Sequence, residues 1–210
     1  MEFSAELIRK QLAGRPRRTI AEWEARPAAV LLPLFARPGG LSREREGTWR
    51  LLFTERTHDV EDHKGQVAFP GGRVDEGDGS RVHTALREAE EEIGLARQDV
   101  TVLGALDELL TVTQYRVTPV VGTFRHPYRF RTSRAEIADI FDAPLDWLAD
   151  PANLETQYRT SPIGGPPIPV YYFRYQGHTI WGVTARIVVQ LLEVIRSTDE
   201  RSETKPISDL

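Results

Sequence analysis

The sequence predicts a single domain of mixed α/β class, and three observations support this prediction. The chain has 210 residues without an internal repeat or a break in composition, and a chain of that length buries roughly 70% of its unfolded surface. Apolar runs of strand length occur at residues 28–35, 49–54 and 117–124. Apolar residues three and four positions apart mark two helices, at residues 80–94 and 184–195.

Composition excludes several classes of function. Cysteine is absent, which excludes disulfide scaffolds, cysteine-ligated metal centres and thiol nucleophiles. The formal charge of −4 argues against a nucleic-acid partner, because nucleic-acid binding depends on surplus Lys and Arg. No run of eighteen apolar residues occurs and the N-terminus lacks the apolar segment of a signal peptide, so we expect a cytoplasmic protein without a membrane partner. The sequence does not specify an oligomeric state.

The first 27 residues predict a helix followed by an extended lead-in. Apolar residues recur on one stripe between Phe3 and Leu12, and Gly14 follows where the helix would end. The run Arg15–Arg18 is too short to indicate a nucleic-acid site, and we expect it to be solvated.

The first strands follow directly. Residues 28–35 are apolar on both faces, which is typical of a strand in the middle of a sheet. Residues 49–54 resume as a strand and predict a long hairpin with the first. Residues 66–69 predict a short strand. Two aromatic residues, Phe69 and Trp181, are expected in the core.

The second half of the chain alternates strands with short helical segments. Strand-like runs occur at residues 100–106 and 117–124, while residues 134–141 fit either a short helix or the start of a strand. Residues 144–148 fit one helical turn. Residues 150–169 are rich in proline and predict a loop.

The C-terminal part predicts a hairpin and a helix. Residues 170–175 and 178–181 flank Gln176–Gly177, a plausible turn. Residues 184–195 form the second amphipathic helix, and the polar residues 197–210 predict a flexible tail.

A group of carboxylates lies along the helix predicted for residues 80–94. At 100° per residue, Glu88 and Glu92 lie side by side on one flank of the buried stripe, and Glu91 is within reach of the same space. Like charges four positions apart destabilise a helix, and Arg87 is the single nearby cation. A solvated acidic face is one interpretation. The other is a Mg²⁺ site, because Mg²⁺ prefers carboxylate oxygens; Mn²⁺ accepts the same ligands.

The spacing of these residues resembles the signature of the Nudix hydrolases. Gly72 is followed fifteen residues later by Arg87-Glu88, then by Glu91-Glu92 and Gly94-Leu95. The interval from Gly72 is one residue longer than the common form, and Asp78 stands where a glutamate is usual.

The resemblance implies the Nudix fold, an α/β/α sandwich with a mixed β-sheet and a loop–helix–loop over residues 72–95. The hydrolase domain would span residues 28–196, between the lead-in of residues 1–27 and the tail of residues 197–210. One helix would cover each face of the sheet.

Other segments resemble the coenzyme A pyrophosphatase subfamily. The matching segments are Leu51–Arg56, His63–Gly72, Thr84–Leu95, Val117–Gly122, Pro144–Leu145 and Ile180–Ala185. The resemblance implies hydrolysis of coenzyme A to 3′,5′-ADP and 4′-phosphopantetheine, with oxidised and acyl forms as alternative substrates. One departure is Val60-Glu61-Asp62, where the subfamily usually carries a basic residue. It leaves open ADP-ribose, a dinucleotide or nucleotide-capped RNA as the substrate. A module that senses a nucleotide without cleaving it is a third alternative.

The resemblance also assigns the catalytic roles. It implies that Glu88 and Glu92 bind Mg²⁺ or Mn²⁺ and that Glu91 completes the metal site. Arg87 would orient a glutamate, or else serve only as a surface partner of Glu91. The general base would be a glutamate of the signature or a later carboxylate, for which Glu136 is the candidate.

The remaining expected residues concern the substrate. Gly71 and Gly72 would let the backbone turn tightly beside the metal. Arg56, His63 and Gln66 would contact the substrate or shape the loop over it.

Overall fold

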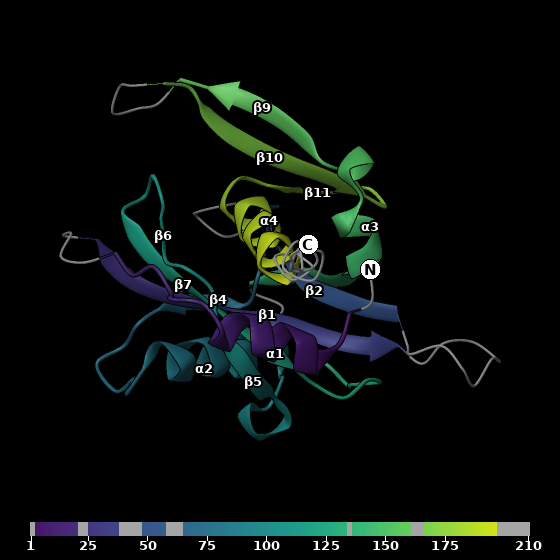
Figure 1. The fold of residues 1–210 in the computed structure, drawn as a ribbon. Helices are drawn as coiled ribbons and strands as arrows, with labels where there is room; N and C mark the ends of the chain where they lie inside the picture. Colours follow the sequence, from purple (N-terminus) through teal and green to yellow (C-terminus); the bar gives the residue numbers. More distant parts are fainter. Residues whose placement is uncertain are drawn as a thin grey trace, which may run out of the picture.

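The computed structural model describes residues 3–20, 25–37, 48–57, 65–133, 136–160 and 166–196. A mixed sheet of eight strands lies between helix α2 on one face and helices α1 and α4 on the other, and a second sheet of three strands lies beyond α4 (Figure 1). The α/β/α arrangement with a mixed sheet is therefore confirmed.

The elements follow one another along the chain with short connections. None of the described helices is long and apolar enough to cross a membrane. The elements are α1 (Ala5–Ala13), β1 (Arg26–Arg37), β2 (Thr48–Arg56), β3 (Val67–Ala68), β4 (Gly71–Arg73), α2 (Arg81–Ile93), η1 (Arg97–Asp99), β5 (Thr101–Ala105), β6 (Leu109–Leu110), β7 (Tyr115–Thr123), β8 (Ile137–Pro144), α3 (Leu145–Ala149), η2 (Pro151–Asn153), β9 (Glu155–Arg159), β10 (Ile168–Tyr175), β11 (His178–Trp181) and α4 (Gly182–Arg196).

Strand β1 is the centre of the large sheet. It runs parallel to β7 along nearly its whole length, pairing Arg26 with Tyr115 and Leu34 with Thr123. On its other edge it changes partner, because residues 28–30 pair with β4 and residues 34–37 pair with β2. The main path through the sheet is β3-β2-β1-β7-β5, with β4 on β1, β6 on β7 and β8 on β2.

Two apolar clusters fix the helices to opposite faces of this sheet. Ala85, Ala89 and Ile93 of α2 pack with Leu31 and Phe35 of β1. The opposite face packs against α1 and α4 through another set of buried side chains, including Ile8, Leu12, Leu32, Leu34, Val188 and Leu192. Because successive residues of a strand point to opposite faces, the continuous apolar run of β1 serves both clusters.

Helix α2 begins and ends where the sequence predicts. The Ser80 hydroxyl accepts the His83 N–H at 3.1 Å as the N-cap. At the other end Gly94 adopts φ +68°, the left-handed conformation that glycine accepts without steric cost. The carboxylate-bearing part of the helix is thus held at both ends.

Two expectations from the sequence are wrong. Residues 150–169 are not a continuous loop, because Glu155–Arg159 form β9; all five side chains are exposed, so no apolar alternation marks the strand. Trp181 is 37% exposed and stacks on Tyr172, whereas Phe69 is buried as expected.

The segment Arg15–Arg18 is solvated as expected at residues 16–18, which are exposed, but it is also attached to the domain. The Arg15 guanidinium donates to Asp107 at 2.7 Å, and the same carboxylate accepts the Arg18 N–H at 2.9 Å. The segment therefore lies against the body of the domain. The ambiguous residues 134–141 contribute to a strand, β8, in their described part, and residues 197–210 lie outside the described residues.

Candidate active site

The candidate active site lies between α2 and the sheet, at the point where the edge of β1 passes from pairing with β4 to pairing with β2. Gly71 pairs with Val30 and Gly72 with Ala29, so β4 occupies the part of the β1 edge that is not paired with β2. A Cβ atom on Gly72 would overlap the carboxylate of Glu88, and one on Gly71 would overlap the backbone of β1. Gly71 therefore requires glycine because the backbone of β1 approaches it so closely, whereas a side chain at Gly72 would displace the Glu88 carboxylate, the far end of a flexible side chain.

Glu92 is the most buried of the three glutamates of this site. It is 6% exposed, and its Oε2 accepts the Gly71 N–H at 3.3 Å. Burial, and secondarily the charge of Glu88, raise the pKa of Glu92 to about 8, and Glu136 adds to this while Arg56 opposes it. An ionised Glu92 is therefore costly unless a further cation lies beside it.

Glu88 lies one turn earlier, and Arg87 neutralises part of its charge. Its carboxylate is 17% exposed and lies 2.9 Å from the Arg87 guanidinium. Burial raises the pKa of Glu88, whereas the neighbouring Arg87 charge lowers it. The sequence correctly predicts that Glu88 and Glu92 border the buried stripe of α2.

Arg87 has a buried partner that the sequence does not identify. Its Nε and Nη2 donate to the two carboxylate oxygens of Asp78 at 3.1 and 3.0 Å. Asp78 is 2% exposed on its side chain, and the hydrogen bond from Arg87 holds the pKa of Asp78 far below its usual range. The same guanidinium donates to the Arg73 carbonyl at 3.1 Å, which ties α2 to the end of β4. In the sequence, Asp78 is notable only because it stands at a loop position where a glutamate is usual.

Glu91 is more exposed than the other two glutamates and shares the Arg87 guanidinium with Glu88. Its carboxylate is 57% exposed and accepts a hydrogen bond from Arg87 at 3.0 Å. In the described ranges of the chain, no three acidic or histidine side chains lie close enough together to hold a metal ion. The structure thus brings Glu88 and Glu92 together and leaves Glu91 on the outer side of Arg87.

The Glu88 and Glu92 pair fits a hard divalent cation. Both are carboxylates, the ligands that Mg²⁺ and Mn²⁺ prefer. Arg87 lies against Glu88, whereas the Glu92 carboxylate accepts a hydrogen bond from a neutral backbone N–H, that of Gly71. A cation between the two would offset both burial and mutual repulsion.

Arg56 and Glu136 lie together at the end of β2. Arg56 pairs in register with Ile137, and the Thr57 N–H donates to the Glu136 carbonyl at 2.9 Å. Glu136 is exposed, and both side chains are near enough to Glu92 to alter its pKa. The Arg56 N–H also donates to the Gln66 carbonyl at 3.0 Å, so Gln66 borders the same place.

One predicted substrate contact cannot be placed. His63 lies outside the described residues, as does the departure at Val60-Glu61-Asp62.

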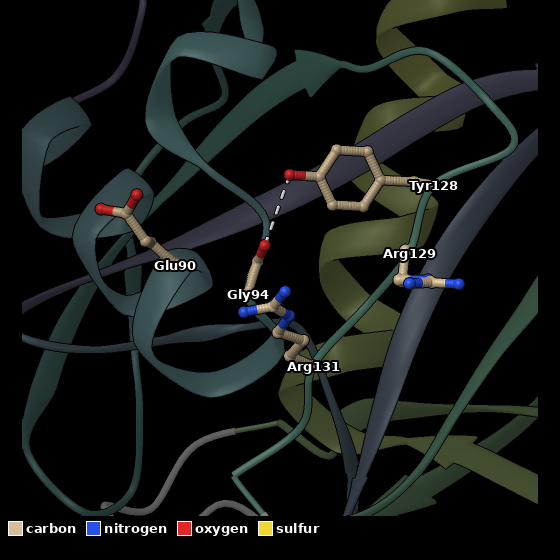
Figure 2. Close-up of a pocket in the computed structure, with 5 residues that line it drawn as sticks. All are labelled: Glu90, Gly94, Tyr128, Arg129 and Arg131. Atoms are coloured by element: carbon tan, nitrogen blue, oxygen red, sulfur yellow. Dashed lines mark hydrogen bonds between the residues drawn. The ribbon is translucent and has the colours of Figure 1, made fainter.

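A shallow hollow beside the C-terminal end of α2 is separate from the glutamate pair. It is lined by Glu90, Gly94, Tyr128, Arg129 and Arg131, and Figure 2 shows that the Glu90 and Arg129 side chains point away from each other. The Tyr128 hydroxyl donates to the Gly94 carbonyl at 3.3 Å or to Asp99. These contacts anchor the loop after β7 to the end of α2, and the lining residues do not converge on one point.

Comparisons with known proteins agree with this geometry. The NUDIX domain family matches residues 33–150. The Nudix hydrolase NudL of Pectobacterium atrosepticum is 39% identical over 173 residues, covering 80% of this chain and 82% of the relative. The NudL protein of Escherichia coli K12 is 39% identical over 170 residues, covering 79% and 81%.

Among solved structures, a MutT/nudix family protein from Enterococcus faecalis shares the fold. Its TM-score is 0.50 at 12% identity, covering 98% of this chain and 78% of that one. The family match, the NudL relatives and the placement of the signature on α2 lead to one conclusion. The chain belongs to the Nudix hydrolases, enzymes that hydrolyse nucleoside diphosphate derivatives.

Proposed function

We propose that this protein hydrolyses the diphosphate bond of coenzyme A, releasing 3′,5′-ADP and 4′-phosphopantetheine, with oxidised and acyl coenzyme A as further substrates. Water supplies the oxygen that forms the new bond to phosphorus, the bridging P–O bond breaks, and the bridging oxygen leaves with the other phosphate. The observation that best supports this proposed catalytic activity is the buried Glu92 carboxylate, which lies beside Glu88 on α2.

Glu88 and Glu92 are the proposed ligands of Mg²⁺ or Mn²⁺. When bound, such an ion neutralises the charge of a diphosphate and lowers the pKa of water. Glu91 is a proposed further ligand or base, and would need to leave its contact with Arg87 to reach the pair. Gly71 and Gly72 are proposed to let the backbone turn tightly beside the metal and the substrate, because they allow β1 and the Glu88 carboxylate to approach closely.

Arg87 is a proposed positioning residue. It is held on Asp78 by two hydrogen bonds and contacts Glu88 and Glu91 at 2.9 and 3.0 Å. A guanidinium fixed in this way sets the orientation of both carboxylates. Its role is therefore to keep Glu88 aimed towards Glu92.

Arg56 and Glu136 are proposed to act at the substrate. Arg56 would bind a phosphate oxygen at the end of β2, where its Nε is buried without a hydrogen-bond partner among the described residues. Glu136 is exposed next to it and could take the proton of the attacking water, as general base. Gln66 and His63 are proposed to shape the loop over the substrate.

The choice of coenzyme A rests on the motif from His63 to Gly72 and the other matching segments. Glu61-Asp62 favours the second candidate, a Nudix hydrolase for ADP-ribose, a dinucleotide or nucleotide-capped RNA. The intact set of Glu88, Glu91 and Glu92 argues against a sensor that binds without cleaving. We expect the reaction in the cytoplasm, where coenzyme A and Mg²⁺ are both abundant.

The test is product analysis of purified protein with coenzyme A, ADP-ribose and a dinucleoside polyphosphate, each with Mg²⁺ or Mn²⁺. Metal-dependent release of 3′,5′-ADP, faster than cleavage of the other two, is the expected result. Cleavage of the other substrates alone would replace coenzyme A by the second candidate. No cleavage of any would contradict the enzymatic role.

A further inference from the structure

Three arginines from separate parts of the chain meet near the first turn of α2. Arg17 precedes β1, Arg81 is the first residue of α2, and Arg116 belongs to β7. Arg17 and Arg116 lie 3.6 and 3.9 Å from the same carboxylate, that of Glu108. Arg81 is near enough to both arginines and to Glu108 for their charges to alter its pKa. We call Arg17, Arg81 and Arg116 the arginine cluster.

Arg116 lies on the side of the sheet that α2 covers. Alternate residues of a strand share a face, so Arg116 lies on the same face as Val120, which packs in the apolar cluster under α2. The cluster reaches the surface, because the Arg17 side chain is 35% exposed and that of Arg116 is 22% exposed. An anion from solvent can therefore contact it.

Positive charge exceeds negative charge in this cluster. Glu108, which is 6% exposed on its side chain, lies 3.6 Å from Arg17 and 3.9 Å from Arg116. Its oxygens already accept hydrogen bonds from a hydroxyl and from a backbone N–H. Within the described part of the chain, no carboxylate forms an ion pair with Arg81. Burial, then the charge of Arg116, lower the pKa of Arg81, and the charge of Arg17 adds to this while Glu108 opposes it.

The arginine cluster is aligned with the candidate metal ligands. Glu88 and Glu92 follow Arg81 by seven and eleven positions, so all three lie within about 20° of one direction around α2. At 1.5 Å per residue, Arg81 lies about 10 Å from Glu88 along the helix axis. One flank of α2 thus carries two carboxylates at one end and an arginine of the cluster at the other.

We propose that the arginine cluster binds a phosphate monoester of the substrate that lies apart from the reacting diphosphate. This inference rests on the proposed function, in which that group is the 3′-phosphate of coenzyme A. A guanidinium presents paired N–H donors that match phosphate oxygens. ADP-ribose has no such phosphate, so the cluster would favour coenzyme A over it.

Replacing Arg81 is the change that distinguishes phosphate binding from a purely structural role of the arginine cluster. Arg116 donates to the Ile20 carbonyl at 2.7 Å and so helps to hold the chain before β1. A loss of activity on replacing Arg116 could therefore come from a displaced segment. Arg81→Gln is the informative variant, and Arg129→Gln is its matched control, since Arg129 is exposed in the hollow at the opposite end of α2 (Figure 2).

The experiment compares coenzyme A with dephospho-coenzyme A, which lacks the 3′-phosphate. For R81Q we expect kcat/KM on coenzyme A to fall roughly 10- to 50-fold, mainly through KM, from the loss of one charge-assisted contact. On dephospho-coenzyme A we expect a change of less than about twofold, and R129Q should match the wild type on both. Calorimetric binding of adenosine 3′,5′-bisphosphate should weaken by a similar factor in R81Q, while binding of AMP stays unchanged.

Two results would overturn the proposal independently of the enzymatic assignment. One is an equal loss of kcat/KM on coenzyme A and dephospho-coenzyme A in R81Q, and the other is unchanged binding of adenosine 3′,5′-bisphosphate in R81Q. Either would show that Arg81 does not bind the 3′-phosphate. Turnover of coenzyme A by the wild type would still support the proposed function. Conversely, a wild type that cleaves neither form contradicts the proposed function, and the comparison of bisphosphate with AMP still decides the role of Arg81.

Discussion

Replacing Glu92 by glutamine tests whether this carboxylate is destabilising in the absence of a cation. Glutamine keeps the shape of the side chain and an acceptor for the Gly71 N–H, but it carries no charge. The pKa of Glu92 is about 8 in the folded protein against an ordinary 4.5. At about 1.36 kcal/mol per pKa unit, ionising Glu92 in the metal-free fold costs roughly 5 kcal/mol.

The sign of the pH dependence follows from proton binding. Between about pH 4.5 and 8 the folded protein keeps a proton on Glu92 that the unfolded chain has lost. The free energy of unfolding of the wild type therefore falls, relative to that of E92Q, as pH rises through this window. Above about pH 8 the difference is complete and stays constant.

Urea denaturation with EDTA at pH 5, 7 and 9 measures this difference. The stability of E92Q minus that of the wild type should grow by roughly 4 kcal/mol from the lowest to the highest pH. Glu91→Gln is the matched control for the loss of a carboxylate from the same turn of α2, because Glu91 is 57% exposed. A constant difference between E92Q and the wild type across this range would refute the argument that burial raises the pKa of Glu92.

Two further predictions concern the surroundings of the glutamate pair. Gly72→Ala should lower the hydrolysis rate about 100-fold, because its Cβ displaces the Glu88 carboxylate. The free energy of unfolding should change by only about 1 kcal/mol or less, since that carboxylate is the far end of a flexible side chain. Gly77→Ala, which meets nothing within 4 Å, is the control in both assays. Asp78→Asn should cost about 3 kcal/mol at neutral pH by leaving Arg87 without its buried partner. Because the pKa of Asp78 is lowered by folding, that loss should shrink as denaturation is measured at increasingly acid pH, and a loss independent of pH would contradict the ion pair.

Much of the fold could be predicted because its core elements carry a strong apolar pattern. Residues 28–35 have the continuous apolar run of a central strand, and α2 shows both its periodicity and its terminal glycine. Strand β9 could not be predicted, because all its side chains are exposed and its pairing with β10 involves the backbone. Trp181 was misplaced because an aromatic residue in a strand pattern gives no sign of which face is covered.

The residues of the candidate site likewise fall into those that a local sequence pattern predicts and those that only the folded chain brings together. Helical periodicity alone puts Glu88 and Glu92 on one flank, since both belong to the same element. The partner of Arg87 could not be predicted, because Asp78 reaches it through the conformation of a loop. The arginine cluster likewise depends on the register of β7 with β1, which pairs residues about ninety positions apart and leaves no local signal.

The most direct test of the central claim is the rate of 3′,5′-ADP release from coenzyme A at saturating Mg²⁺, measured side by side for the wild type and E92Q. The proposed role of Glu92 requires turnover by the wild type and a rate at least about 1,000-fold lower in E92Q, with the variant as stable as the wild type or more so in the metal-free state. Equal rates in the two proteins would contradict the claim that Glu88 and Glu92 form the catalytic metal site.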